Sequence, residues 1–305
     1  MRQDSFSDAG FEKYRKKTRK DQFSEEMETI IPWQELAEAI GPFCPKPEGA
    51  GRRPIGIERM LRIRFIQRGF NLSDPAAEEA RYDSHSLRQF VGIDLGREPV
   101  PDETTICKFR HLMEKHNLGD QLLHLVNQYL QENGLKVSRG TIVDASIISA
   151  PSSTKNKKKE REPDMHSTRK GNQWYFGMKA HIGVDSRTRL IHSVAATPAN
   201  VDDSQVLPDL LHGEETRVWG DSAYTGQKHA MTDCAPQARD FTQAKGSRNR
   251  KLTETERAKK RNMSRVRAKV EHQFGIIKRQ FGFFQGSIPR SGKKCSSTVV
   301  GLCAE

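Results

Sequence analysis

The period of the apolar residues changes at Gly134, and this change restricts the possible architectures more than any other feature of the chain. Before Gly134, apolar side chains recur every three to four positions, which is typical of amphipathic helices. After it, short β-rich runs alternate with helical stretches. A chain of 305 residues is long enough for two domains of ordinary size. We therefore expect an all-helical domain over 1–134 and an α/β domain over 135–284.

The second part opens with three β-rich runs, at 141–150, 175–185 and 189–197, and a tight turn over 185–188 joins the last two. The complete order of elements is β-β-β-α-β-α-β-α. Three antiparallel strands followed by αβ units on a mixed sheet is the element order of an RNase H-like domain. The later elements are expected as a helix around 206–211, a strand at 217–220, a helix near 226–233, a strand near 240–243 and a long helix over 253–281.

Within the helical part, Pro32 begins a short helix that Gly41 ends, and a longer helix carries an apolar stripe over 57–65. Asp102 caps a further helix, which Gly119 separates from the next one. Such a pair suits a helix-turn-helix and equally any αα-hairpin. Three arginines lie away from the apolar stripe and form either a solvated face or a phosphate-contacting face: Arg59, Arg62 and Arg68.

The segment 151–174 is polar, highly charged and without apolar periodicity, and it contains seven Lys and Arg residues. Connections of this length inside a domain are uncommon and are functional or disordered when they occur. The basic content suits a loop that orders on a phosphate backbone. A loop that only improves solubility is the alternative.

The charge of the chain indicates a polyanionic partner. Lys and Arg number 51 against 39 Asp and Glu, which leaves a net charge of +12. Between 245 and 279, thirteen cations face three glutamates, so this stretch alone carries +10 of that charge. A soluble protein with such an excess usually binds nucleic acid, and a membrane surface is the weaker alternative.

Several classes of protein are disfavoured by what the sequence lacks. The five cysteines form no C-x-x-C pair, and the chain has no P-loop, dinucleotide-binding, serine-hydrolase or zincin motif. A structural zinc and a nucleotide are therefore not expected. The N-terminus carries charges where a signal peptide needs apolar residues, and no apolar run is long enough to span a membrane. We expect a cytosolic protein with reduced thiols.

Two aspartates lie on or directly after predicted strands, at positions where functional side chains are often found. Asp144 lies inside the apolar run IVDASII, and an ionisable group among core residues requires a partner. A structural Arg or Lys partner is the alternative to a functional role. Asp221 ends the strand RVWGD, and functional groups gather at the carboxyl ends of strands. Capping of the following helix is the alternative for Asp221.

A third carboxylate, Glu271, lies on the long helix beside its buried stripe. Arg267, Glu271 and Lys278 fall on one row of this helix, at i, i+4 and i+11. An ordinary i,i+4 ion pair between Arg267 and Glu271 is the alternative reading. On a strand near Asp144, Lys179 and His181 share one face, and His181 is interpreted as a hydrogen-bonded structural residue.

These segments together resemble a known family. The runs VDAS at 143–146, GDSAY at 220–224 and RVRAKVEHQFGIIKRQFGF at 265–283 are similar to the DDE transposases of bacterial insertion sequences, and most similar to the insertion-sequence-five type. The specific part is the spacing from Arg267 to Glu271 and Lys278. Related signatures often carry a Tyr three residues before the Arg, where this chain has Ser264.

The resemblance implies a transposase that cleaves DNA and transfers strands at an RNase H-like catalytic domain. Catalysis would use Asp144, Asp221 and Glu271, with Asp144 bridging two Mg²⁺ ions, for which Mn²⁺ is a possible substitute, and each of the others completing one. The expected partners are the double-stranded DNA of the element ends, bound by the helical domain, the target DNA, and a second copy of the chain in the DNA complex. The expected location is the bacterial cytosol, associated with the nucleoid.

The resemblance and the charge pattern also assign contacts with DNA. These are expected from Arg267, Lys278, Lys179, Arg265, Lys269 and Tyr224, the last by stacking on an unpaired base.

The segment 285–305 lacks the final apolar helix that relatives usually carry, and it is expected to be disordered or frameshifted, with weak or no activity in this copy. A non-catalytic DNA-binding remnant and a structure-selective nuclease of the same fold are the alternative functions.

Overall fold

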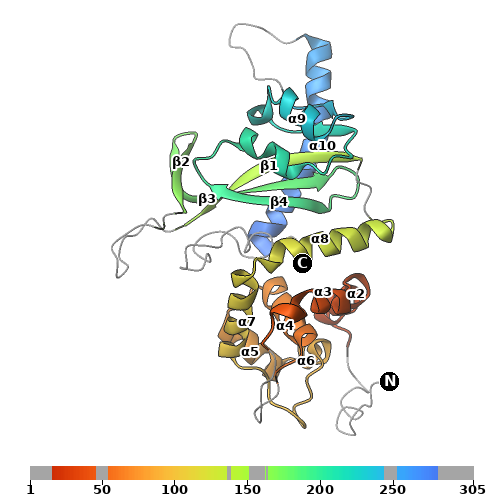
Figure 1. The fold of residues 1–305 in the computed structure, drawn as a ribbon, viewed down its shortest axis with the longest axis vertical. Helices are drawn as coiled ribbons and strands as arrows, with labels where there is room; N and C mark the ends of the chain where they lie inside the picture. The colour runs from red at the N-terminus through yellow and green to blue at the C-terminus, as the bar shows by residue number, and fades with distance from the viewer. Residues whose placement is uncertain are drawn as a thin grey trace.

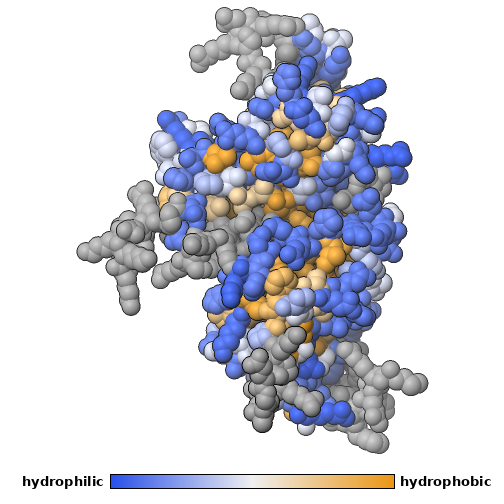
Figure 2. Space-filling model, in the orientation of Figure 1, coloured by the Kyte–Doolittle hydropathy of each residue, from blue (hydrophilic) through white to orange (hydrophobic). Residues whose placement is uncertain are grey.

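The structure, a computed structural model, describes residues 16–45, 54–135, 139–150, 162, 164–243 and 253–280. The expected tail over 285–305 and the first part of the expected basic loop lie outside these residues. No helix of the described part is long and apolar enough to cross a membrane. On the face drawn in Figure 2, hydrophilic side chains predominate and apolar ones gather in patches.

The N-terminal part is helical, as the apolar period predicts. Apolar side chains of its helices form one core, which includes Trp33, Ile63, Phe90 and Ile106. Its elements are α2 (Arg19–Ile30), α3 (Trp33–Ile40), η1 (Gly41–Phe43), α4 (Ile57–Gly69), α5 (Asp74–Asp83), α6 (His85–Val91), α7 (Glu103–Lys115) and α8 (Leu118–Glu132).

The predicted ends of these helices are correct in two places and wrong in one. Helix α3 follows Pro32 and ends before Gly41, and the Asp102 carboxylate caps α7 by accepting from the Thr105 amide at 2.7 Å. Gly119, however, does not separate α7 from α8, because it lies buried inside the first turn of α8. Asn117 makes the break with a left-handed backbone (φ 50°), a conformation that Asn tolerates better than most residues.

Neither predicted role fits Arg62, which is only 8% exposed. Its guanidinium donates to Glu28 at 2.8 Å and to Glu58 at 2.9 Å. The guanidinium carbon lies 4.8 Å from the centre of the Trp33 ring. Arg62 therefore links α2 to α4 as a paired cation within the core, and is not part of a phosphate-contacting surface.

The α/β part is the RNase H-like fold predicted from the element order. Strand β3 pairs with β1 and with β4 in antiparallel fashion. Strand β5 pairs with β1 in parallel, and β6 pairs with β5 in parallel. An additional strand, β2, pairs with the start of β3. The strands are β1 (Gly140–Ser149), β2 (His166–Lys170), β3 (Gln173–Asp185), β4 (Ile191–Pro198), β5 (Arg217–Trp219) and β6 (Arg239–Asp240).

Helices cover both faces of this sheet. Val270 and Phe274 of the long helix, and Ile277 of the turn that follows it, pack on one face against Ile142 and Ile182 of the sheet. Figure 1 shows this helix, α10, crossing the sheet from behind. Segments between the strands pack on the other face, around Val143 and Val218. These elements are η2 (Asp203–Leu210), η3 (Ser222–Tyr224), α9 (Lys228–Cys234), α10 (Glu254–Gly275) and the π-helical turn η4 (Ile276–Gln280).

The prediction of a patternless loop over 151–174 is wrong for its last third. Residues 166–170 and 173–177 form an antiparallel hairpin. Period-two alternation is not visible there because the residues on both faces of the hairpin are polar or exposed, so no apolar set marks the strand.

Candidate active site

The three predicted carboxylates line a single cleft of about 520 Å³, which also contains a fourth, that of Asp203. Strand β5 pairs with β1 only up to Ile142, so among the described residues this edge of β1 has no strand partner from Val143 onward. Asp144 stands on this free edge, Asp221 follows the end of β5, and Glu271 reaches the same place from α10.

Asp144 is largely buried, and burial raises the pKa of its carboxyl to about 6. The backbone amide of Ala145 donates to its Oδ1 at 2.9 Å, and Nε of Arg267 lies 3.8 Å from its Oδ2. Both groups favour the ionised form, whereas the nearby Asp221 and Asp203 oppose it. Asp144 is thus a carboxylate whose negative charge is only partly compensated.

Asp221 caps the following helix and also lines the cleft. Its Oδ1 accepts from the Ala223 amide at 2.8 Å and so caps the short helix η3, while its side chain lines the cleft. Gly220 makes the tight turn possible, because a Cβ there would lie 3.0 Å from the Tyr224 ring and 3.1 Å from Val143. The turn holds the carboxylate at the end of β5.

Arg267 lies between Asp144 and Glu271. Its Nη2 is 3.9 Å from Glu271, one helical turn away, and Glu271 is 68% exposed. The Nε of Arg267 is buried, and within the described residues it has no hydrogen-bond partner. A buried donor of this kind is costly unless a further acceptor reaches it, as a phosphate oxygen in the cleft would.

Lys278 and Lys179 are both anchored at the cleft. Lys278 donates to the Ser146 hydroxyl on β1, and burial lowers its pKa, with Lys170 adding to the effect. Lys179 donates to the Asp203 carboxylate at 2.8 Å and to the Val201 carbonyl at 2.7 Å. The sequence does not mark Asp203 as a residue of the cleft, because Asp203 begins a 3₁₀ helix after a turn, where no periodicity distinguishes it.

The other predicted DNA contacts differ in their environment. Arg265 is exposed on α10. Lys269 donates to the Ser186 carbonyl at 2.6 Å and so ties α10 to the turn after β3. Tyr224 is only 1% exposed, and burial raises the pKa of its hydroxyl above the usual value. The assignment of Tyr224 as a stacking residue is therefore corrected, because its ring belongs to the core beneath Asp221.

His181 is a buried residue of β3, which agrees with the prediction that it is a hydrogen-bonded structural residue. Its Nε2 lies 2.8 Å from the Thr197 hydroxyl. Burial lowers the pKa of His181 to about 4.

The carboxylates of the cleft fit a divalent cation by their chemistry. Carboxylate oxygens are the ligands that Mg²⁺ prefers, and the partly compensated charge of Asp144 favours a cation beside it. Among the described residues, however, no three His, Cys, Asp or Glu side chains are grouped closely enough to hold a metal. The Arg267 guanidinium lies close to both Asp144 and Glu271, with distances of 3.8 Å and 3.9 Å.

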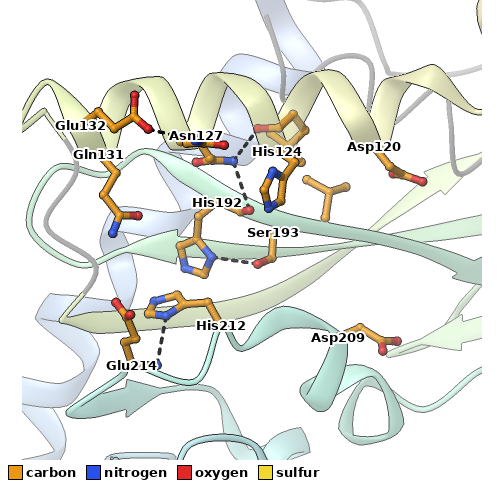
Figure 3. Close-up of a pocket in the computed structure, with 13 residues that line it drawn as sticks. Asp120, His124, Asn127, Gln131, Glu132, His192, Ser193, Asp209, His212 and Glu214 are labelled. Carbon is orange, nitrogen blue, oxygen red and sulfur yellow. Dashed lines mark hydrogen bonds between the residues drawn. The ribbon is translucent and has the colours of Figure 1, made fainter. Parts of the chain in front are cut away.

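A second cavity, of about 610 Å³, lies between α8 and the sheet and shares no lining residue with the cleft. Figure 3 shows His124 and Asn127 of α8 above His192 of β4 and His212 of the loop before β5. The Asn127 amide donates to the His192 carbonyl at 3.2 Å, which connects the helical part to the sheet.

Comparisons with known proteins match both parts of the chain. A family model described as "Transposase DDE domain" matches residues 136–286, and a model described as "Transposase domain (DUF772)" matches residues 12–112. Among solved structures, the chain is similar to piggyBac transposase in a synaptic complex with hairpin DNA, determined by cryo-EM. That similarity has a TM-score of 0.45 and 8% sequence identity, and it covers 92% of this chain and 70% of the other.

Proposed function

The chain belongs to the DDE transposases, and we propose from this premise that it binds the terminal inverted repeats of an insertion sequence of the insertion-sequence-five type. In this proposal the helical part recognises the element ends, and the cleft of Asp144, Asp221 and Glu271 cleaves the DNA and joins it to a target. Two copies of the chain act together in the DNA complex.

The observation that supports this proposal most strongly is the convergence of the three carboxylates. They come from β1, from the turn after β5 and from α10, and they line one cleft. Asp144, Asp221 and Glu271 would hold Mg²⁺, with Mn²⁺ as a substitute. When bound, divalent ions activate the attacking oxygen and stabilise the leaving oxygen of a phosphodiester.

The remaining residues of the cleft bind and orient the DNA in this proposal. The Nε of Arg267 has a free hydrogen for a phosphate oxygen, and Lys278 adds positive charge at the other end of the same helical row. In the cleavage step water attacks a phosphorus and displaces the 3′-oxygen of the element end, which leaves as a 3′-hydroxyl. In the joining step this 3′-hydroxyl attacks a phosphorus of the target DNA and displaces a 3′-oxygen of the target. Arg267 moves from the carboxylates to the phosphate as the DNA enters.

The test is cleavage and joining of DNA that carries the element ends, with Asp144→Asn beside the parent. The variant should lose both reactions and keep its DNA affinity, because it removes one carboxylate oxygen but no cation. Asp209→Asn is the matched control, since Asp209 is exposed on η2 and lines the second cavity instead of the cleft. Cleavage by Asp144→Asn at the parental rate would contradict the assignment.

The same assay separates the alternative functions. A parent that binds the ends without cutting them is a non-catalytic remnant. A parent that cuts but never joins is a nuclease of the same fold.

A further inference from the structure

The hairpin of β2 and β3 is a rigid projection beside the cleft. Five residue pairs join its strands, from His166 with Gly177 to Lys170 with Gln173. Its two-residue turn begins with Gly171 at φ 63°, a backbone conformation that Gly adopts without strain. The Arg169 guanidinium donates to the Gly171 carbonyl at 3.0 Å and fastens the turn. Figure 1 shows the hairpin at the left edge of the sheet.

Trp174, near the tip of this hairpin, is 67% exposed, more than the other exposed large hydrophobic residues of the described part. A single exposed apolar residue is ordinary on a protein surface. Trp174 is distinguished by its neighbours, since its cross-strand partner Arg169 lines the cleft together with Thr168 and Lys170. Its indole is therefore presented at the rim of the candidate active site.

The register places Trp174 on the same face of the sheet as the catalytic carboxylate. Side chains alternate along a strand, so Trp174 shares a face of β3 with Ala180 and Ile182. Ile182 pairs directly with Asp144 on β1. The ring and the Asp144 side chain thus lie on the side of the sheet that α10 covers.

The charges around the ring favour an anionic ligand. Arg169 and Lys170 belong to the hairpin, and Lys170 acts electrostatically on Lys278 of the cleft. An exposed aromatic ring flanked by cations is the arrangement by which proteins hold single-stranded nucleic acid, with bases stacked on the rings and phosphates near the cations.

We propose that Trp174 is a stacking platform for an unpaired base of the DNA strand that enters the cleft, with Lys170 beside the adjoining phosphate. This proposal rests on the proposed function, because it presumes DNA in the cleft. Stacking tolerates any base and contributes about 1–3 kcal/mol per base. It would hold the end of a strand open next to the carboxylates, the role for which the buried Tyr224 is unavailable.

The experiment measures the affinity of the full chain for two DNA probes of the same sequence, one blunt and one with a short single-stranded overhang that carries 2-aminopurine. The parent should prefer the overhang and quench the 2-aminopurine fluorescence. Trp174→Ala should bind the overhang probe about 5- to 150-fold more weakly and bind the blunt probe as the parent does. The variant should also no longer quench the 2-aminopurine fluorescence. Trp174→Phe should retain most of both, because it keeps an aromatic face. Tyr82→Ala is the control, since Tyr82 is an exposed aromatic residue of α5 in the helical part.

Three results would overturn the stacking role. The first is that Trp174→Ala retains the overhang preference and the quenching. The second is that Trp174→Ala weakens the binding of both probes equally, which would indicate a general contact. Loss of self-association with unchanged DNA binding would also overturn it and assign the ring to a protein interface. Failure of the proposed function appears differently, as DNA cleavage that is absent or independent of Asp144, whereas overhang binding and quenching require no cleavage.

Discussion

Burial shifts the pKa values of two neighbouring titratable groups, Asp144 and His181, in opposite directions. It raises the pKa of Asp144, because an ionised carboxylate is poorly solvated in the cleft, and it lowers the pKa of His181, because an imidazolium is poorly solvated within the sheet. Ala145 on β1 pairs with His181 on β3, so the histidine is placed one register position from Asp144. A neutral His181 adds no positive charge beside the carboxylates at neutral pH.

His181 should make the free energy of unfolding fall as the pH becomes acidic. Its pKa is about 4 when folded against an ordinary value of 6.5, so between these values the unfolded chain binds a proton that the folded chain does not. The stabilisation is complete above pH 6.5 and is lost as the pH falls toward 4. The free energy of unfolding should fall by roughly 3 kcal/mol from this source, at 1.36 kcal/mol per pKa unit.

Urea unfolding of the parent and of His181→Gln at neutral and acidic pH measures this contribution. The difference in unfolding free energy between the two pH values should be smaller in the variant. His111→Gln, a change at an exposed histidine of α7, is the control and should follow the parent. An equal acid response of the parent and His181→Gln would show that His181 is not responsible.

Helix α10 combines three surfaces in one element. Its buried stripe, which includes Val270 and Phe274, packs on the sheet. A second row carries Arg267 and Glu271 to the cleft. The first half of the helix exposes a series of cations, among them Lys259, Lys260, Arg261 and Arg265. A capping box of Thr253 and Glu256 begins the helix and so fixes this basic half in a helical conformation.

The exposed cations of α10 should determine the salt dependence of DNA binding. Each phosphate contact contributes about 0.9 to the slope of log affinity against log salt concentration. The double variant Arg261→Gln and Arg265→Gln should therefore reduce this slope by about two units. Arg97→Gln is the control, because Arg97 is exposed and already paired with Asp94. An unchanged slope in the double variant would show that this half of α10 faces solvent in the complex and does not contact phosphates.

At the scale of the whole molecule, α8 joins the two parts of the fold. Figure 1 shows it between the sheet and the other helices. Asn127 is buried on this helix, and its amide donates both to Leu123 of the same helix, at 2.9 Å, and to the His192 carbonyl of β4. This contact gives the helical part a fixed attachment to the strand that carries His192.

Replacement of Asn127 should weaken this attachment. Asn127→Ala removes the buried amide that donates to the His192 carbonyl, and the loss of a buried hydrogen-bond partner costs about 1–3 kcal/mol. Asn133→Ala is a matched control, because Asn133 makes the same bond to the residue four positions earlier but is exposed and has no partner on β4 among the described residues. Thermal unfolding should show a lower Tm for Asn127→Ala than for Asn133→Ala. Equal Tm values would show that other contacts carry the attachment.

The sequence by itself determined the order of the elements except for β2, and it singled out the three carboxylates that line the cleft. Helical and strand periods are local properties, so α4, β1 and α10 are predictable from their own residues. The spacing of Arg267, Glu271 and Lys278 is equally local, because one helix carries all three. These are the features that also carry the family resemblance.

Only the tertiary structure decided which polar residues are buried and which meet. Arg62 enters the helical core because Glu28 and Trp33, distant in the sequence, surround it. Tyr224 is buried and Trp174 is exposed on the hairpin of β2 and β3, although both are aromatic residues in polar sequence. Asp203 reaches Lys179 across 24 positions. Burial and long-range pairing depend on how elements pack against one another. The apolar periodicity of one helix or strand does not show which other elements pack against it.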